Sequence, residues 1–267
     1  MKLGFIGAGN MAQGIIKGLI STNKISSDKI IITASTPSRS QLLAKELGVT
    51  SASSNMELVA AVDIVILATK PYLLPEILRA INTPELATNK LFISIAAGLT
   101  LDSLSAHLPL EQKIIRVMPN MNISIGHSVS AVCGNDYVSK HDIAQVINLF
   151  ETVGSAYEVS EKDFSNFTSL AGCSPAYTYL YIDAMSRSGV KNGLPKKLAT
   201  KIAAEAVLGS AKMVLESLDE TPWDLIDKVC SPGGTTIAGL VALEEEAFMA
   251  TVIKGLEATI QRDAELS

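Results

Sequence analysis

The chain has 267 residues, of which 48% are hydrophobic and 18% are charged, so it can form a buried core and does not have the composition of a disordered protein. Its formal net charge is −5 and it has no Lys/Arg block, which argues against nucleic acid or an anionic membrane as the main partner. No apolar run reaches the roughly 18 residues that a membrane-spanning helix needs.

The first part of the chain alternates short apolar runs with helical patterns, which is typical of βαβ units and a mostly parallel sheet. The runs are rich in Ile and Val, as expected for strands buried on both faces. Capping signals mark a helix between Thr36-Pro37 and Gly48, and the start of another at Ser139 to Asp142. We expect strands at residues 3–6, 30–33, 64–69, 91–96, 114–118, 129–132 and 156–159.

A glycine-rich turn follows the first expected strand and precedes a helical pattern. Its sequence, Gly7-Ala8-Gly9-Asn10-Met11-Ala12, has the form G-x-G-x-x-A. Gly7 allows a tight turn, Gly9 lets the backbone approach a pyrophosphate, and Ala12 permits close packing of the helix on the strand. The helix N-terminus adds unpaired N–H groups for the phosphates. Its position between a strand and a helix favours a dinucleotide site over a purely structural turn.

The end of the second strand bears on the choice between NADPH and NADH. Enzymes that use NAD usually place an Asp or Glu there to bind the ribose 2′-hydroxyl, and residues 32–39 contain no carboxylate. Ser35, Thr36 and Arg39 could instead hold a 2′-phosphate, which favours NADPH, with NADH still possible. In the alternative interpretation, Thr36 is only a helix cap and Arg39 a solvated side chain.

Further cofactor contacts are expected where the third strand ends, because the carboxyl ends of parallel strands line the ligand crevice. Lys70 lies there, although it could be an ordinary surface lysine. We include Asn55, Ala68, Thr69, Lys70 and Pro71 among the expected cofactor contacts, together with Asn10 and Met11 of the first turn.

After residue 159 the pattern changes to helical periodicity, without a further convincing strand. We expect helices at 161–170, 175–191, 195–217, 222–229 and 235–265, the last broken near residues 244–246. We therefore divide the chain into a Rossmann-type dinucleotide-binding domain, 1–159, and an all-helical domain, 160–267. Apolar surface left over on such helices suits a dimer interface.

A second glycine turn, Cys230-Ser231-Pro232-Gly233-Gly234-Thr235-Thr236-Ile237, lies in the helical part. Two adjacent glycines are costly inside a helix, but at its start they free N–H groups to bind an anion such as a carboxylate. Thr235 and Thr236 add hydroxyls that both donate and accept hydrogen bonds. The alternative is a plain interhelical turn capped by Ser231.

The cysteines and histidines do not indicate a metal site. Cys133, Cys173 and Cys230 are far apart, lack the paired spacing of a zinc site, and are not accompanied by a histidine cluster. Free thiols fit a reducing compartment, so we expect a cytoplasmic protein without a metal.

The order of motifs resembles the pyrroline-5-carboxylate reductase family over nearly the whole chain. The motifs are GFIGAGNM at 4–11, ATKP at 68–71, SIAAG at 94–98, RVMPN at 116–120, GLP at 193–195 and the highly specific SPGGTTIAGL at 231–240. The resemblance implies a Rossmann domain and a helical domain that interlocks with its twin in a dimer, with rings of dimers in some members. The implied reaction is hydride transfer from NAD(P)H to the C=N carbon of Δ1-pyrroline-5-carboxylate, giving L-proline.

The resemblance also implies roles for the second glycine turn. The substrate carboxylate is expected on the backbone amides of Gly233, Gly234 and Thr235, with Ser231 supporting the loop. The Thr236 hydroxyl is expected to contact the ring nitrogen, which makes it the candidate catalytic group. A protonated imine is already electrophilic, so positioning and exclusion of water can supply the catalysis without a metal or a nucleophile.

One segment departs from the family pattern and keeps alternatives open. Where the family usually has LSGSGPAY, residues 170–177 read LAGCSPAY, and the hydroxyls lost at Ala171 and Cys173 could change the substrate. The alternatives are a paralogue that reduces another cyclic imine, an inactive NADPH-binding regulatory protein, or a 3-hydroxyacid dehydrogenase-like enzyme. The last normally relies on a lysine in the helical half, for which the candidates are Lys191, Lys196, Lys197 and Lys201.

Overall fold

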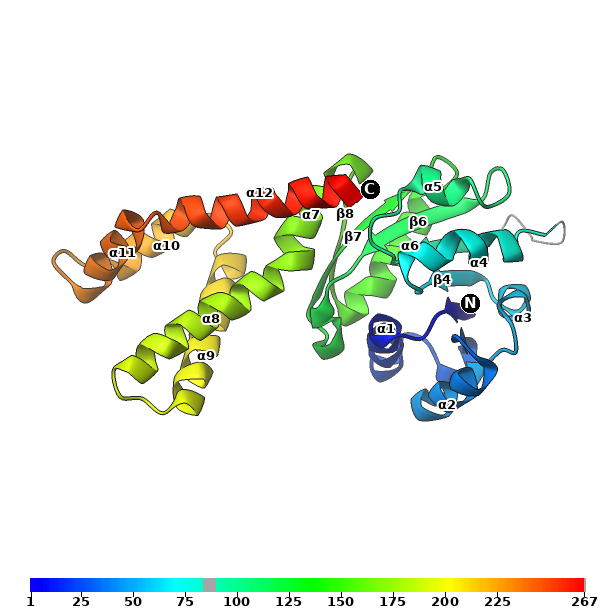
Figure 1. Cartoon of the computed structure of the whole chain (residues 1–267), viewed down its shortest axis with the longest axis horizontal. Helices are drawn as coiled ribbons and strands as arrows, with labels where there is room; N and C mark the ends of the chain where they lie inside the picture. The colour runs from blue at the N-terminus through cyan, green and yellow to red at the C-terminus, as the bar shows by residue number, and fades with distance from the viewer. Residues whose placement is uncertain (84–89, 267) are drawn as a thin grey trace. The chain divides into compact units, whose positions relative to one another are not determined.

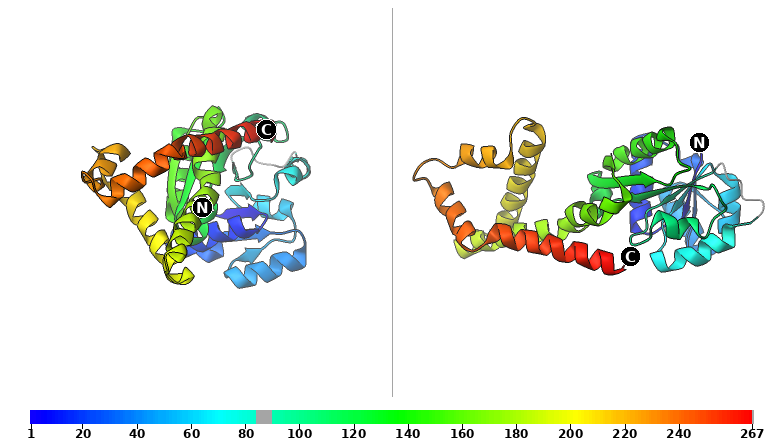
Figure 2. Two further views of the ribbon diagram at one scale, coloured as in Figure 1. Left: turned by 60° about the vertical axis from the view of Figure 1, so that its left-hand side comes forward. Right: turned by 90° about the horizontal axis from the view of Figure 1, so that it is seen from above.

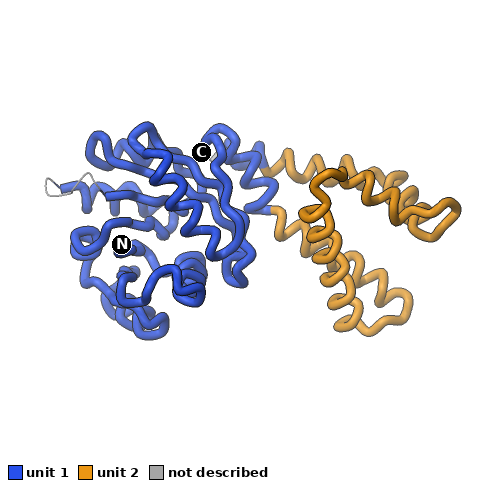
Figure 3. Tube along the Cα trace, turned by 180° about the vertical axis from the view of Figure 1, so that it is seen from behind, with its two compact units in different colours: residues 1–173, 260–267 blue, residues 174–259 orange. Residues whose placement is uncertain are grey.

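The computed structural model describes residues 1–83 and 90–266, which form two compact units (Figure 3). The first unit contains Met1–Cys173 and the end of the chain from Ile260, and the second contains Ser174–Thr259. The C-terminal helix therefore begins in the second unit and ends in the first.

The first unit is built on a sheet whose strands, within the described residues, run in the order β3-β2-β1-β4-β5-β6-β7-β8 (Figure 1). All neighbouring strands are parallel except β6 and β7. The chain order reverses between β1 and β4, which makes this pair the topological switch point. The strands are β1 (Leu3–Ile6), β2 (Ile30–Thr33), β3 (Thr50–Ser51), β4 (Ile64–Leu67), β5 (Leu91–Ser94), β6 (Lys113–Met118), β7 (Ser128–Gly134) and β8 (Gly154–Glu158).

Helices cover both faces of this sheet (Figure 2). Successive strand residues point to opposite faces, so Phe5 packs in one core cluster and Ile6 in the other. The first cluster is completed by α1 (Asn10–Ser21), α2 (Pro37–Leu47) and α6 (Lys140–Phe150), and the second by α3 (Asn55–Ala61), α4 (Leu74–Ile81) and α5 (Leu101–Ser105). Short helical turns join these elements: η1 (Ser27–Lys29), η2 (Pro71–Leu73), η3 (Met121–Ile125) and η4 (Glu151–Val153).

The expected strands and caps of this unit are confirmed. Thr36 accepts a hydrogen bond from the Arg39 backbone N–H, and Gly48 ends α2 in the left-handed conformation with φ 70°. Ser139 and Asp142 form the expected capping box at the start of α6. The strands expected to run to residues 69 and 96 are shorter, because the chain leaves the sheet after Leu67 and Ser94.

The helix expected at 161–170 is replaced by three short turns within the first unit. These are η5 (Glu161–Asp163), α7 (Phe164–Phe167) and a π-helix, η6 (Thr168–Cys173). A uniform apolar period does not distinguish these turns from one α-helix, because the difference lies in the hydrogen-bond spacing.

The second unit is helical, as expected, and buries little of its own surface. Its helices are α8 (Ser174–Lys191), α9 (Lys196–Glu216), α10 (Pro222–Val229), α11 (Thr235–Glu245) and the first part of α12 (Phe248–Leu266). The break between α11 and α12 falls at residues 246–247, beside the expected 244–246. All residues of this unit are described, and the buried ones are Pro175, Ser186, Ala199 and Ala203. In the single chain, large apolar side chains are therefore exposed on the surface of this unit, and Leu218, for example, is 89% exposed.

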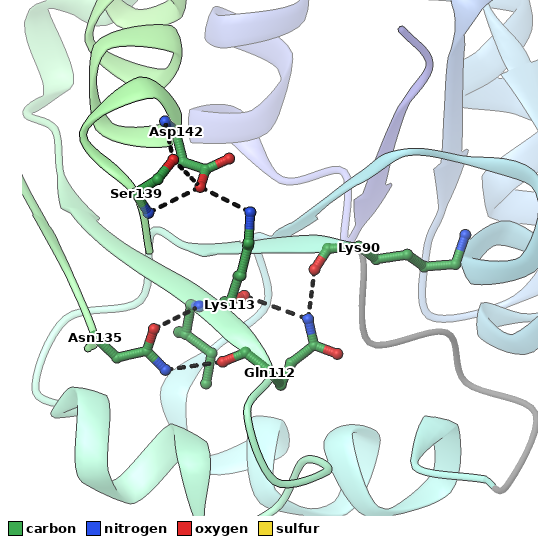
Figure 4. Close-up of polar contacts among 7 residues, drawn as sticks. Lys90, Gln112, Lys113, Asn135, Ser139 and Asp142 are labelled. Carbon is green, nitrogen blue, oxygen red and sulfur yellow. Dashed lines mark hydrogen bonds and ion pairs between the residues drawn. The ribbon is translucent and has the colours of Figure 1, made fainter. Parts of the chain in front are cut away.

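A polar network ties together the amino ends of β5 and β6 (Figure 4). The Gln112 side-chain amide donates to the Lys90 carbonyl, and the Asn135 amide donates to the Gln112 carbonyl at 2.8 Å. Lys113 Nζ lies 2.9 Å from Asp142 Oδ2. Although burial alone raises the pKa of Asp142, hydrogen bonds from Ser139 and Lys113 outweigh it and lower the pKa to about 2. Side chains of the protein itself therefore occupy the amino ends of these two strands.

Candidate active site

The first glycine turn forms an open helix tip at the carboxyl end of β1. Gly7 has φ 97°, and a Cβ added there would lie 2.7 Å from the Ala68 carbonyl oxygen, so only glycine fits. Gly9 is the N-cap of α1 in extended conformation, and no side chain caps the helix. A Cβ at Gly9 would meet nothing within 4 Å, so its outward face is open space. The turn thus leaves room for a group such as a pyrophosphate to approach the backbone.

A cavity of about 810 Å³ lies at the carboxyl ends of β1, β2 and β4, with Ile95 from the residue after β5 on its wall. This is the crevice at the topological switch point, and its size suits a cofactor. Nine of the predicted cofactor residues line it: Gly7, Gly9, Asn10, Met11, Ser35, Asn55, Ala68, Thr69 and Lys70.

The remaining three predicted cofactor residues lie outside the lining. Thr36 caps α2, and Pro71 begins η2. Arg39 is exposed and has no carboxylate partner among the residues the structure describes. Ser40 closes the loop beside them, since its hydroxyl accepts from the Ala34 N–H at 2.7 Å and donates to the Thr36 carbonyl at 3.1 Å. The cap expected as an alternative role for Thr36 is therefore present.

Two polar side chains define the inner wall of the cavity. The Thr33 hydroxyl donates to Asn55 Oδ1 at 2.7 Å and so fixes the Asn55 amide at the N-terminus of α3. The Thr69 hydroxyl oxygen is buried and has no hydrogen-bond partner among the described residues. A buried hydroxyl without a partner is uncommon, and here it lies on the wall of a ligand-sized cavity.

Sequence reasoning missed Thr33 and the apolar lining formed by Ile6, Leu73, Ile77 and Ile95. The signal was available in part, because Ile95 lies near the carboxyl end of the strand expected at 91–96. Leu73 and Ile77 lie one turn apart, at the end of η2 and within α4, so their common direction depends on where these helices begin.

The second glycine turn is also an open helix tip. Gly233 has φ 70°, and the Gly234 N–H donates to the Ser231 carbonyl at 3.0 Å. Gly234, rather than Ser231, is the N-cap of α11, and no side chain caps this helix. The alternative of a turn capped by Ser231 is therefore wrong. The first N–H groups of α11 are left for a ligand, as in any helix without a side-chain cap.

Three of the five residues predicted to bind substrate line two hollows of the second unit. Gly233 and Gly234 line a shallow groove of about 450 Å³ that also contains Glu245. Thr236 lines a larger cavity of about 860 Å³, with Cys230 and Tyr181. Ser231 and Thr235 are exposed and line neither hollow.

Comparison with known proteins decides the family. Residues 161–266 match the family model described as pyrroline-5-carboxylate reductase dimerisation, and residues 2–98 match the one described as NADP oxidoreductase, coenzyme F420-dependent. Pyrroline-5-carboxylate reductase from Escherichia coli (strain K12) is 39% identical over 266 residues, which cover 100% of this chain and 98% of that protein. The chain belongs to the pyrroline-5-carboxylate reductase family. The resemblance inferred from the sequence motifs is thereby confirmed.

Solved structures of the family have the same fold. The Streptococcus pyogenes pyrroline-5-carboxylate reductase superposes with a TM-score of 0.88 at 42% identity, covering 98% of both chains. The Plasmodium falciparum pyrroline carboxylate reductase, solved with NADP bound, has a TM-score of 0.88 at 33% identity and covers 100% of this chain and 98% of its own. Family membership makes this chain an NAD(P)H-dependent oxidoreductase with a dimerisation domain in its second half.

The lysines named for the dehydrogenase-like alternative, Lys191, Lys196, Lys197 and Lys201, are all exposed. Lys196 pairs with Asp183 at 2.6 Å, and Lys201 Nζ lies 3.8 Å from Glu205. Burial, with the Glu161 carboxylate nearby, raises the pKa of the Cys133 thiol to about 12, so this thiol stays protonated. Within residues 1–83 and 90–266, no three His, Cys, Asp or Glu side chains lie close enough to hold a metal ion. The same residues contain no helix long and apolar enough to cross a membrane.

Proposed function

We propose that this protein reduces Δ1-pyrroline-5-carboxylate to L-proline with NADPH as the preferred donor and NADH as a possible one. The observation that carries the proposal is the full-length match to proteins named pyrroline-5-carboxylate reductase. When bound, the cofactor supplies a hydride to the C=N carbon, and the protonated ring nitrogen keeps its proton as the double bond becomes single. Substrates with a different cyclic imine remain the main alternative.

The cofactor role rests on the cavity at the switch point. The open face at Gly9 and the uncapped N-terminus of α1 suit the pyrophosphate. The unpartnered Thr69 hydroxyl offers the bound dinucleotide a buried hydrogen-bonding group. The loop at Ser35 and Thr36 lacks a carboxylate, and Arg39 is free of ion pairs within the described residues, which supports a 2′-phosphate there.

The substrate role rests on the uncapped N-terminus of α11. Its first unpaired N–H groups, those of Thr235 and Thr236, suit a carboxylate, because the helix dipole places partial positive charge at this end. In the proposal Ser231 supports the loop through its carbonyl, and the Thr236 hydroxyl contacts the ring nitrogen as the catalytic group. A preorganised hydroxyl that accepts a hydrogen bond from the protonated ring nitrogen needs no metal.

The proposal extends to organisation and location. Residues 1–159 form the dinucleotide-binding domain, and residues 160–267 form the dimerisation and substrate domain, supported by the family model over 161–266. We propose a homodimer that can assemble into a larger ring of dimers, working in the cytoplasm. The exposed apolar side chains of the second unit support the dimer.

The test is to mix purified protein with NADPH and pyrroline-5-carboxylate and to follow the absorbance of the reduced cofactor. Rapid oxidation supports the proposal, oxidation only with other imines supports a paralogue, and binding of NADPH without turnover supports a regulatory protein. Gly9→Val adds a residue-level test, because its side chain fills open space and should leave the fold intact while raising the Kd for NADPH at least tenfold. Gly9→Ala, with a smaller side chain, should have a smaller effect. Unchanged NADPH affinity in both variants would refute the phosphate role of this turn.

A further inference from the structure

Asn120 is a buried polar residue directly beyond β6, only 4% exposed, and every polar group of its side chain is paired. Its Oδ1 accepts from the Asn122 backbone N–H at 3.1 Å, and its Nδ2 donates to the Ala171 carbonyl at 2.9 Å. Its own backbone N–H donates to Ser128 Oγ at 3.2 Å. Asn120 thus joins segments of chain that are far apart in sequence.

The Ala171 carbonyl needs such an outside donor. In an α-helix it would accept from the backbone nitrogen of residue 175, but that residue is proline and has no N–H. A proline ring also crowds the carbonyl four residues before it, and the chain here adopts a π-helix over Thr168–Cys173. The Asn120 amide therefore donates to the Ala171 carbonyl in place of the N–H that Pro175 lacks.

Side chains of β6 also contact the turns that precede and include the π-helix. Alternate residues of a strand share a face, as Arg116 and Met118 of β6 do, and Asn120 follows two residues after the strand ends. Arg116 lies 3.0 Å from Glu161 and stacks over the Phe164 ring at 4.5 Å. Met118 Cε lies 3.3 Å from the position of a Cβ on Gly172. This row of three side chains fixes residues 161–173 against the sheet.

The other end of the Asn120 contact leads to the cofactor helix. By accepting from the Asn122 N–H, Asn120 caps η3. Ile123 of η3 packs on α1 so closely that a Cβ at Gly14 would lie 2.9 Å from its Cγ2. The Asn120 amide therefore links the π-helical turn, through η3, with helix α1, which begins after Gly9. These contacts lie on the side of the sheet where β1, β4 and β6 have their carboxyl ends.

We propose that Asn120 is a positioning residue that holds the π-helical turn Thr168–Cys173 in a fixed place relative to α1 and so sets the geometry for reduction. The proposal rests on the proposed function, because hydride transfer is the step it serves. Asn120 does not line the cofactor cavity. Its loss should therefore lower turnover more than cofactor affinity.

The experiment compares Asn120→Asp and Asn120→Ala with a matched control, Asn148→Asp. Asn148 also donates its Nδ2 to a carbonyl, that of Ala144 at 3.0 Å, but it is exposed on α6. At about pH 8 we expect both Asn120 variants to lose about tenfold in kcat, the scale of one buried hydrogen bond, with less than a twofold change in the Kd for NADPH. The control should match the wild type.

Two further readouts separate positioning from general damage. The ratio of Asn120→Asp to wild-type turnover should rise as the pH falls to about 5.5, because burial favours the protonated acid, which can donate to the Ala171 carbonyl. Asn120→Ala should show no such recovery. Amide hydrogen exchange at residues 168–174 should be at least tenfold faster in Asn120→Ala, and this readout needs no turnover.

The outcomes separate this inference from the proposed function. If the wild type does not reduce pyrroline-5-carboxylate but exchange at 168–174 accelerates in Asn120→Ala, the proposed function is wrong, whereas Asn120 still holds the π-helical turn in place. If the wild type is active and the Asn120 variants keep its kcat and its exchange pattern, the inference is overturned. Equal losses of kcat at every pH in both variants, with unchanged exchange, would also overturn it.

Discussion

Thr69→Val replaces the unpartnered hydroxyl of the cofactor cavity by a methyl group of nearly the same size. Leaving a buried hydroxyl without a partner costs about 1–3 kcal/mol, so removing it should raise the free energy of unfolding of the cofactor-free protein by about 1 kcal/mol. For a unit of this size that corresponds to an increase in Tm of roughly 2–4 °C. The same hydroxyl is available to bound NADPH, so its loss should raise the Kd about 5- to 10-fold. Thermal unfolding without cofactor and a fluorescence titration with NADPH measure the two effects.

Thr33→Val is the matched control, because the Thr33 hydroxyl lines the same cavity but donates to Asn55. There the substitution leaves the Asn55 oxygen without its donor, so the cofactor-free protein should become less stable by about 1 kcal/mol. The opposite signs of the two stability changes are the diagnostic result. A Thr69→Val protein with unchanged NADPH affinity, or with lower stability than the wild type, would refute the assignment of this hydroxyl to the cofactor.

Two other substitutions test the N-terminus of α11 and the ion pair between Asp142 and Lys113. Thr236→Ala should lower kcat by roughly 10- to 100-fold, the scale of one lost active-site hydrogen bond, and leave the Kd for NADPH intact; wild-type kinetics would remove Thr236 from the mechanism. Asp142→Asn should reduce the free energy of unfolding by about 1 kcal/mol at neutral pH. Because hydrogen bonds lower the pKa of Asp142 from 3.8 to about 2, its contribution is complete above about pH 4 and disappears as the pH falls through about 2. Denaturant titrations at pH 7 and near pH 2 should therefore show a much smaller stability difference at the lower pH, and an equal difference at both would contradict this role.

The sheet and the two glycine turns could be predicted because their signals are local. Apolar runs define buried strands, and Gly7 and Gly233 are needed at positive φ where the chain turns between a strand and a helix or between two helices. The capping pairs at Thr36 and Ser139 are equally local. These features depend on a few neighbouring residues and not on the rest of the molecule.

What could not be predicted depends on contacts between distant segments. The strand β3 has two residues and pairs only because β2 lies beside it. The π-helix at 168–173 accepts a hydrogen bond from Asn120, about fifty positions away in the sequence. The placement of Thr236 on a different hollow from Gly233 depends on the packing of helices against α11. Periodicity gives no information on any of these.

The sparse interior of the second unit has a consequence for how the protein responds to its own concentration. Large apolar side chains of this unit, including Leu208, Leu215 and Leu218, are exposed in the single chain, and association with another chain would bury them. By mass action, the melting temperature of the helical half should then rise with protein concentration, whereas the Rossmann half, with its two core clusters, should unfold independently of it. Dilution should unfold the helical half first, and with it the turn that we propose to bind the substrate.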